Sequence, residues 1–201
     1  IEVGAKIVYM STDYVFDGTK EGAYLEDDQV NPMSVYGKTK YQGEEEVRRN
    51  PNHFITRISW VFGINGNNFI KTMLKLSETK SELNVVDDQI GSPTYTVDLA
   101  KLLVEMCETE KYGTYHVNNE GTCSWAEFAE YIMELNERQT KINKVTTEEY
   151  LEITGSKQAY RPRNSVLSKD KLVDNGFEML PSWQDATERY CLELKRNKKI
   201  K

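Results

Sequence analysis

The chain has 201 residues, of which 38% are hydrophobic and 29% charged, enough for one good core or for one core with a small satellite. A formal net charge of -6 argues against a nucleic-acid-binding surface, and no apolar stretch approaches the about 20 residues that a membrane-spanning helix needs. We therefore expect no membrane or nucleic-acid partner. The three cysteines, Cys107, Cys123 and Cys191, form no pair at metal-binding spacing, so we expect reduced thiols in a cytoplasmic protein.

The first part of the chain alternates predicted strands and helices. A strand over 6–11 is followed by a long polar loop over 12–32 and by a helix over 34–49, which Asn50 and Pro51 end. A strand over 53–59, a helix over 67–80, a strand over 82–86, a helix over 97–108 and a strand over 114–117 come next. This alternation with short connections predicts an α/β fold with a doubly wound, mainly parallel sheet.

Beyond residue 118 the pattern changes. Ser124 and Glu127 form a capping box that opens a helix to about 135, a short strand is expected over 142–145, and helices are expected over 168–174 and 182–195. We therefore predict two domains, with the sheet in 1–118, interleaved with segments of the second domain, and a smaller, mixed, mostly helical domain in 119–201.

Polar residues directly follow the first predicted strand. Ser11, Thr12 and Asp13 fall at its carboxyl end, which is where a doubly wound sheet presents groups to a ligand. An alternative interpretation is that Thr12 and Asp13 only cap the loop that follows.

Tyr36 and Lys40 are four residues apart and therefore lie on one face of the predicted helix. A free phenol has a pKa near ~10, and a neighbouring cation favours the phenolate, so such a tyrosine becomes a usable general acid near neutral pH. The spacing alone carries little information, because a chain with 12 tyrosines and many lysines contains such a pair by chance.

Seven longer blocks supply the context that the spacing lacks. They read "STDYVFDG", "YGKTKYQGE", "RISWVFG", "GNNFIKTML", "DDQIGSPTYTVDLA", "YGTYHVNNEGTCSWAEFA" and "RPRNSVLSKDKL". In this order and at these separations they resemble the dTDP-4-dehydrorhamnose reductase family of the extended short-chain dehydrogenase/reductase superfamily. The resemblance implies a Rossmann-like fold in the first domain, sugar-nucleotide binding by the second, and reduction of dTDP-4-dehydro-L-rhamnose to dTDP-L-rhamnose with NADPH or NADH.

The resemblance also implies roles for matching residues. Tyr36 matches the acid that protonates the C4 oxygen of the sugar, Lys40 the lysine that lowers the tyrosine pKa and holds the nicotinamide ribose, and Thr12 a hydroxyl that hydrogen-bonds the same oxygen. The cofactor would contact Ser11, Thr12, Tyr36, Lys40, Ser59, Trp60 and Val61. The substrate would contact Tyr14, Trp60, Asn67, Asn68, Phe69, Gln89, Ser92, Pro93 and Arg161, the last suited to the nucleotide diphosphate.

Several of these residues also fit a purely structural role. Trp60 and Tyr14 fit a hydrophobic core, Asn68 fits a helix cap, and Arg161 fits a surface ion pair. Asp87 and Asp88 are interpreted as a solvated turn.

The sequence offers no resident metal site. His53 and His116 lie in strand patterns without a second ligand nearby, so we interpret both as structural. Some relatives are known with Mg²⁺ at a subunit contact, but no residues here have convincing ligand spacing for it.

The sequence departs from the family in one respect, because it contains no GxGxxG or GxxGxxG dinucleotide motif. The strand over 6–11 corresponds to a mid-sheet strand of the family, so about three βα units of ~30 residues are expected in front of it. Its exposed edge would favour a homodimer or pairing with the absent segment, and NAD(P)H binding by this chain alone should be weak. The residues that choose between NADPH and NADH would lie in the absent part.

Two other functions fit the same resemblance. One is a non-catalytic regulatory protein similar to the regulatory subunit of methionine adenosyltransferase, although such a protein has no chemical need for Thr12, Tyr36 and Lys40. The other is a related nucleotide-sugar reductase or epimerase, against which only the blocks beginning at Asp87 and Arg161 argue.

Overall fold

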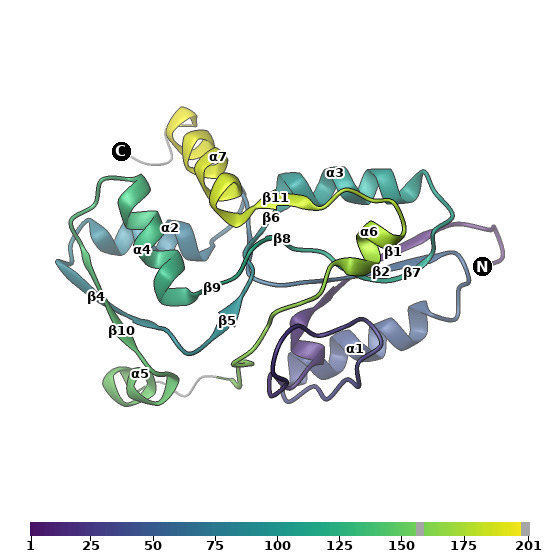
Figure 1. The fold of residues 1–201 in the computed structure, drawn as a ribbon, viewed down its shortest axis with the longest axis horizontal. Helices are drawn as coiled ribbons and strands as arrows, with labels where there is room; N and C mark the ends of the chain where they lie inside the picture. The colour runs from purple at the N-terminus through teal and green to yellow at the C-terminus, as the bar shows by residue number, and fades with distance from the viewer. Residues whose placement is uncertain (156–158, 198–201) are drawn as a thin grey trace.

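The computed structural model describes residues 1–155 and 159–197, and its elements form two lobes that lie side by side (Figure 1). The sheet lobe contains β1 (Ile7–Thr12), α1 (Val35–Val47), β2 (His53–Ile58), α3 (Thr96–Cys107), β7 (Gly113–His116) and α6 (Asp170–Asp174). The helical lobe contains α2 (Phe69–Ser77), β4 (Glu82–Val86), α4 (Trp125–Leu135), β10 (Lys141–Val145), α5 (Thr147–Thr154) and α7 (Trp183–Arg196).

Short elements connect the longer ones. The one-turn helix η1 (Asp13–Val15) follows β1, and β3 (Val61–Phe62) pairs in parallel with β6 (Thr94–Tyr95). Two further pairs join β5 (Ile90–Gly91) to β9 (Cys123–Ser124) and β8 (Asn119–Glu120) to β11 (Leu180–Ser182).

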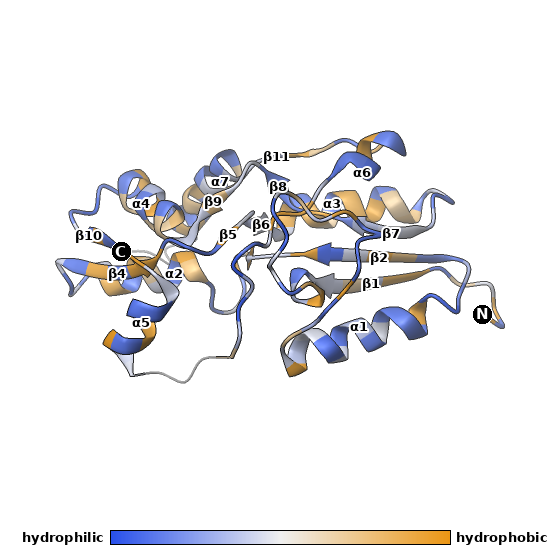
Figure 2. Cartoon of the chain, turned by 60° about the horizontal axis from the view of Figure 1, so that its bottom comes forward, coloured by the Kyte–Doolittle hydropathy of each residue, from blue (hydrophilic) through white to orange (hydrophobic). Residues whose placement is uncertain are grey.

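The main sheet has the order β1-β2-β7, and all its strands are parallel. Successive side chains of β1 point to opposite faces: Val8 and Met10 pack in the cluster that includes α3, whereas Tyr9 and Ser11 contact α1. The two helices therefore cover opposite faces of the sheet, as Figure 2 also shows. The predicted α/β fold with a mainly parallel sheet is confirmed.

The strand at Glu82–Val86 does not belong to that sheet, contrary to the simple alternation expected from the sequence. β4 instead pairs in parallel with β10 in the helical lobe. The reason lies in its side chains: Leu83 and Val85 are buried while Glu82 and Asn84 are exposed, so β4 buries only one face. A central strand of a doubly wound sheet buries both.

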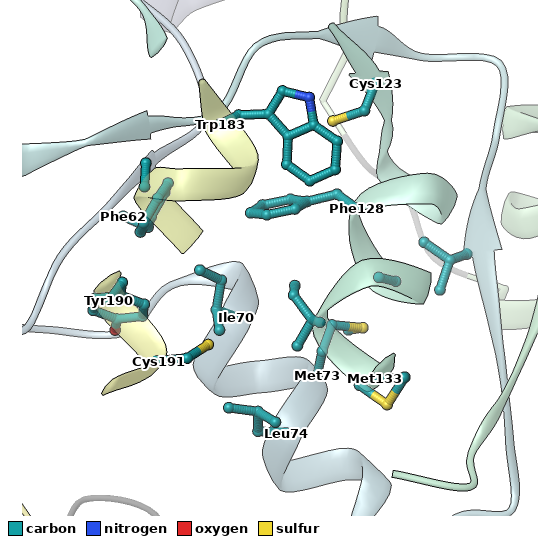
Figure 3. Packing of buried hydrophobic residues seen from close by; sticks show 14 of the residues in the cluster. Phe62, Ile70, Met73, Leu74, Cys123, Phe128, Met133, Trp183, Tyr190 and Cys191 are labelled. Atoms are coloured by element: carbon teal, nitrogen blue, oxygen red, sulfur yellow. The ribbon is translucent and has the colours of Figure 1, made fainter. Parts of the chain in front are cut away.

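Aromatic residues dominate the core of the helical lobe. Phe128 of α4, Trp183 and Tyr190 of α7, and Phe62 pack with Ile70 of α2 in one cluster (Figure 3). The predicted capping box is present, because the Ser124 hydroxyl accepts from the Glu127 N–H at 3.0 Å and the Glu127 carboxylate accepts from the Ser124 N–H at 2.7 Å. Among the residues described, no helix is both long and apolar enough to cross a membrane.

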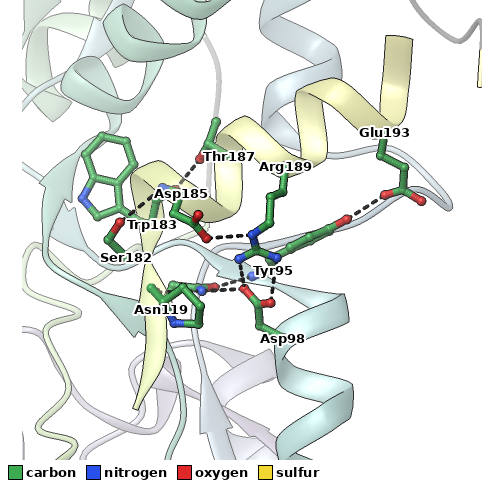
Figure 4. A network of polar contacts seen from close by, with 10 residues as sticks. Tyr95, Asp98, Asn119, Ser182, Trp183, Asp185, Thr187, Arg189 and Glu193 are labelled. Atoms are coloured by element: carbon green, nitrogen blue, oxygen red, sulfur yellow. Dashed lines mark hydrogen bonds and ion pairs between the residues drawn. The ribbon is translucent and has the colours of Figure 1, made fainter. Parts of the chain in front are cut away.

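A polar network fastens α7 to α3 (Figure 4). Arg189 donates two hydrogen bonds to the Asp98 carboxylate, at 2.8 and 2.7 Å, and Asn119 donates a third at 2.9 Å. The Asn119 amide oxygen in turn accepts from the Tyr95 N–H at 2.8 Å. Asp98 is only 4% exposed, so the C-terminal helix is held by a carboxylate whose charge is compensated almost entirely by the protein.

The last part of the chain also returns to the sheet lobe. Leu172 of α6, Phe177 and Leu180 pack against Phe54 of β2 and Tyr115 of β7. The boundary at residue 118 stays a prediction.

Candidate functional site

A cavity of about 470 Å³ opens at the carboxyl ends of β1 and β2, and we call it the strand-end pocket. It brings together every residue that the sequence predicts for the cofactor, together with Tyr14. Its lining consists of Met10, Ser11, Thr12, Asp13, Tyr14, Tyr36, Lys40, Ile58, Ser59, Trp60 and Val61. Residues from two strand ends and one helix therefore meet at one place, as expected for ligand binding in a parallel sheet.

Tyr36 and Lys40 point to this pocket from the first two turns of α1. Tyr36 is 53% exposed, and its ring meets that of Tyr14 edge-on with centroids 5.6 Å apart. The Lys40 ammonium lies 4.6 Å from the centre of the Tyr9 ring, whose hydroxyl donates to the Lys40 carbonyl oxygen at 3.2 Å. Within the described residues neither the Tyr36 hydroxyl nor the Lys40 ammonium has a carboxylate partner, so both groups can serve a ligand.

Helix α1 packs against the sheet lobe through two buried residues, neither of which is apolar and large. Much of this helix is hydrophilic (Figure 2), and its buried residues are Gly37 and Glu44. A Cβ at Gly37 would lie 2.2 Å from the Tyr14 carbonyl oxygen, so only glycine permits this close approach. The depth at which α1 sits, and hence the position of Tyr36, depends on this contact.

Glu44 is the second contact. Its carboxylate is fully buried and accepts two hydrogen bonds from Arg57, at 2.9 and 2.8 Å, one from Arg48 at 2.7 Å and one from the Ser11 hydroxyl at 2.5 Å. The Ser11 side chain is therefore committed to Glu44 beneath the pocket. Burial alone would raise the pKa of Glu44, but the hydrogen bonds and charge of Arg57 outweigh it and lower that pKa.

Thr12 and Asp13 form a buried pair at the base of the pocket. The Thr12 hydroxyl donates to Asp13 at 3.0 Å and accepts from the Tyr14 N–H at 3.2 Å, so Thr12 does cap the turn that follows β1. The Ser165 hydroxyl donates to the other Asp13 oxygen at 2.6 Å. Burial raises the pKa of Asp13 to about 6 against these hydrogen bonds. The sequence places Asp13 among the polar groups at this strand end but assigns it no contact with cofactor or substrate.

Trp60 forms the wall of the pocket opposite α1. Its backbone has φ of 49°, in the left-handed region that non-glycine residues rarely adopt. The indole stacks on Trp125 with centroids 3.6 Å apart and planes 12° apart, and a Cβ at Gly91 would lie 2.8 Å from it. Trp60 thus both packs and lines the pocket.

A second cavity, of about 400 Å³, lies in the helical lobe on the far side of this indole stack, and we call it the aromatic pocket. Three predicted substrate residues line it, namely Phe69, Gln89 and Arg161. The other lining residues are Thr72, Met73, Asn84, Val85, Val86, Trp125 and Tyr150. The sequence did not reveal Trp125, which directly follows the N-cap Ser124, or Tyr150, which lies on a helix that was not predicted.

Four predicted substrate residues line neither pocket. Asn68 is the N-cap of α2, and its amide also donates to the Tyr190 hydroxyl at 2.8 Å, which confirms the helix-cap interpretation. Asn67 is exposed, whereas Pro93 is buried. Ser92 is 1% exposed and its hydroxyl donates to the Gly121 carbonyl oxygen at 2.7 Å, so it lies behind the pocket wall.

The two carboxylates at Asp87 and Asp88 contact helix starts. Asp88 accepts from the Thr147 N–H at 3.0 Å and from its hydroxyl at 2.6 Å, and Asp87 accepts from the Ser124 hydroxyl at 2.5 Å. In the described ranges, no three His, Cys, Asp or Glu residues are grouped so as to hold a metal ion. No ion pair joins Arg161 to a carboxylate in the same ranges.

Comparison with known proteins finds a matching family model and similar proteins for this chain. Residues 1–196 match the RmlD substrate binding domain. The chain is 48% identical over 192 residues to the spore coat polysaccharide biosynthesis protein SpsK of Bacillus subtilis, an alignment that covers 95% of this chain and 65% of SpsK. It is 40% identical over 204 residues to the dTDP-4-dehydrorhamnose reductase of Sinorhizobium fredii, covering 96% of this chain and 67% of that protein.

A solved structure agrees with these relatives. The dTDP-4-dehydrorhamnose reductase of Bacillus anthracis in complex with NADP superposes with a TM-score of 0.88 at 44% identity, covering 96% of this chain and 66% of that one. The present chain therefore spans about two thirds of the length of the relatives that it matches.

Proposed function

Because the chain belongs to the RmlD substrate-binding domain family, we propose that it binds a dTDP-linked 4-keto sugar and takes part in the NAD(P)H-dependent reduction of dTDP-4-dehydro-L-rhamnose to dTDP-L-rhamnose. The observation that carries the proposal is the strand-end pocket, where Thr12, Tyr36 and Lys40 line one cavity. A phenol, an ammonium and a hydroxyl at one place are the groups that carbonyl reduction needs for proton donation and oxyanion stabilisation.

In this proposal Tyr36 donates the proton that the sugar C4 oxygen gains on reduction. Lys40 stabilises the phenolate that remains, because an opposite charge nearby favours the ionised form of a phenol. Thr12 positions the same oxygen when its single hydroxyl hydrogen turns from Asp13 to that oxygen. NAD(P)H supplies the hydride when bound.

The residues present fit one end of that cofactor. Lys40 faces an aromatic ring rather than a carboxylate, so its ammonium can donate to ribose hydroxyls, and Ser59, Trp60 and Val61 provide a wall for the nicotinamide. The sequence contains no glycine-rich turn for the pyrophosphate. This chain therefore has residues for the nicotinamide end only.

The aromatic pocket suits the nucleotide part of the substrate. Phe69, Trp125 and Tyr150 offer ring faces for a pyrimidine base, and Arg161 offers a guanidinium for the diphosphate. Trp125 lines this pocket and stacks on Trp60, which lines the other. One ligand with a base at one end and a sugar at the other would thus contact both pockets.

Calorimetric titration of the chain with dTDP tests the nucleotide site. We expect Arg161→Met to weaken dTDP binding about 10- to 100-fold, the effect of losing a charge-assisted hydrogen bond. Arg163→Met is the matched control, since Arg163 is exposed, lies two residues away and pairs with Glu148 and Asp88. Equal dTDP affinities in the wild type and both variants would rule out this site.

A reduction assay tests the chemistry. Oxidation of NADPH by the 4-keto sugar nucleotide is followed with the chain alone and with the chain mixed with a separately expressed dinucleotide-binding segment of a relative. In whichever preparation is active, Tyr36→Phe should lower kcat by about 10²- to 10⁴-fold. Tyr41→Phe, on the same helix but outside the strand-end pocket, should retain the activity. Unchanged turnover in Tyr36→Phe would exclude its role as the acid.

We also propose a cytoplasmic homodimer. Among the described residues β1 pairs only with β2, which leaves one edge of the sheet without a partner strand. Light scattering coupled to size exclusion should give twice the monomer mass, and a stable monomer at every concentration would exclude the dimer.

A further inference from the structure

Three buried polar residues contact one another at the wall of the strand-end pocket, one in the wall and two behind it. Ser59 precedes Trp60, Thr94 begins β6, and Asn118 lies two residues beyond the end of β7. Their exposed fractions are 2%, 0% and 1%. Because the three come from separate segments, their mutual contacts fix the pocket wall relative to the main sheet.

The hydrogen atoms of this cluster can be counted. The Ser59 hydroxyl donates to the Ser92 carbonyl oxygen at 2.8 Å, and the Thr94 hydroxyl donates to the Ser59 carbonyl oxygen at 2.6 Å. Each hydroxyl has a single hydrogen, so both are used. The Asn118 amide nitrogen lies 2.8 Å from the Ser59 hydroxyl oxygen and 3.0 Å from that of Thr94. Its two hydrogens supply the two donors that these oxygens lack.

The same count fixes which way the Asn118 amide points. With nitrogen and oxygen exchanged, the amide oxygen would face two hydroxyls that have no hydrogen left to donate. In the orientation that the count selects, the Asn118 Oδ1 atom is buried without a hydrogen-bond partner. One Asn118 hydrogen thus binds Ser59 at the turn, and the other binds Thr94, which itself contacts that turn.

That turn carries the strained residue of the pocket. Trp60 has φ of 49°, in the left-handed region that is unfavourable for a residue with a Cβ. The Ser59 carbonyl oxygen on one side is held by the Thr94 hydroxyl, and the Trp60 carbonyl oxygen on the other accepts from the Thr94 N–H at 3.1 Å. The turn is therefore held by Thr94 and, through two hydrogen bonds, by Asn118.

We propose that Asn118 is a positioning residue that holds the Ser59–Trp60 turn, and with it the stack of Trp60 on Trp125, through its two amide hydrogens. Only the kinetic consequence of this inference rests on the proposed function. The geometric consequence can be measured in the absence of any substrate.

The chain contains three tryptophans, and two of them are stacked, so an exciton couplet in the circular dichroism spectrum reports on the Trp60–Trp125 pair. Loss of the couplet in Trp125→Phe assigns it. In Asn118→Asp, a carboxylate of nearly the same shape offers no donor to the two hydroxyls, and we expect most of the couplet to disappear. In whichever preparation reduces the sugar nucleotide, we expect kcat/KM to fall about 10-fold or more.

Thr94→Val provides a second, isosteric variant, because it removes a partner of Asn118 and the bond to the Ser59 carbonyl oxygen without creating a cavity. It should also lose most of the couplet. Leu102→Ala is the control for stability, because Leu102 packs in the α3 core of the sheet lobe; it should lower Tm and keep the couplet. Folded Asn118→Asp and Thr94→Val proteins with the full wild-type couplet would overturn the inference, whether or not the chain proves to be a reductase.

Discussion

The Glu44→Gln variant tests whether a buried charge holds the helix that carries Tyr36 and Lys40. Glu44 is fully buried, and its principal partner Arg57 is 1% exposed. A glutamine of the same shape retains one acceptor oxygen but leaves the Arg57 guanidinium without a compensating charge. Breaking a buried ion pair in this way costs about 3–5 kcal/mol, a large part of the about 5–15 kcal/mol by which domains are stable.

Urea unfolding followed by circular dichroism measures this cost. With a slope of about 2 kcal/mol per molar urea, the midpoint should fall by about 2 M. Glu46→Gln is the matched control, because Glu46 is on the same helix and pairs with Arg49, but the two side chains are 63% and 72% exposed. That change should cost about 0–1 kcal/mol.

The difference between the wild type and Glu44→Gln should also depend on pH. Because the pKa of Glu44 is lowered in the folded protein, its stabilising contribution is present above the unfolded pKa and is lost as the pH falls through the folded pKa. The two proteins should therefore converge in acid. If Glu44→Gln and Glu46→Gln differ by less than about 1 kcal/mol at neutral pH, the ion pair does not hold α1 as argued.

Three further substitutions test other contacts. Burial raises the pKa of Asp13 from 3.8 to about 6, so the contribution of Asp13 to the free energy of unfolding falls by about 3 kcal/mol as the pH rises from 3.8 to 6. Asp13→Asn should lack this pH dependence in urea unfolding. Parallel pH profiles of the wild type and the variant would contradict the prediction. Gly37→Ala places a Cβ 2.2 Å from the Tyr14 carbonyl oxygen and should cost about 1–3 kcal/mol; an unchanged Tm would show that α1 can shift freely. Asp98→Asn weakens the pair with the partly exposed Arg189 and should cost about 2 kcal/mol in urea, whereas no loss would mean that α7 is held by its apolar face alone.

The repeating and local features of the structure were accessible from the sequence. Strands β1 and β2, helix α3 and the capping box at Ser124 were predicted within one or two residues, because apolar periodicity and capping residues are local signals. Helix α5 was missed although Thr146 and Glu149 form the same kind of capping box. It has no fully buried residue, so it shows no apolar stripe.

The contacts that shape the pockets were not accessible in the same way. Ser165 reaches Asp13 across 152 positions, and Asn118 reaches Ser59 across 59. Single polar residues so far apart show no periodicity, and their pairing depends on how the lobes meet. The residues that line the strand-end pocket were therefore easier to predict than the residues that hold them in place.

The interleaving of the two lobes has a consequence for biosynthesis. β4 at 82–86 can pair only after β10 at 141–145 has been synthesised. β7 at 113–116 lies between these two strands in the sequence but belongs to the sheet lobe. Phe54 and Tyr115 are covered only when Leu172 and Phe177 have emerged from the ribosome. Each lobe is completed only by late residues, Leu180 in the sheet lobe and Leu194 in the helical lobe, so apolar surface of both stays exposed through most of synthesis. A nascent chain of this kind is a natural substrate for chaperones.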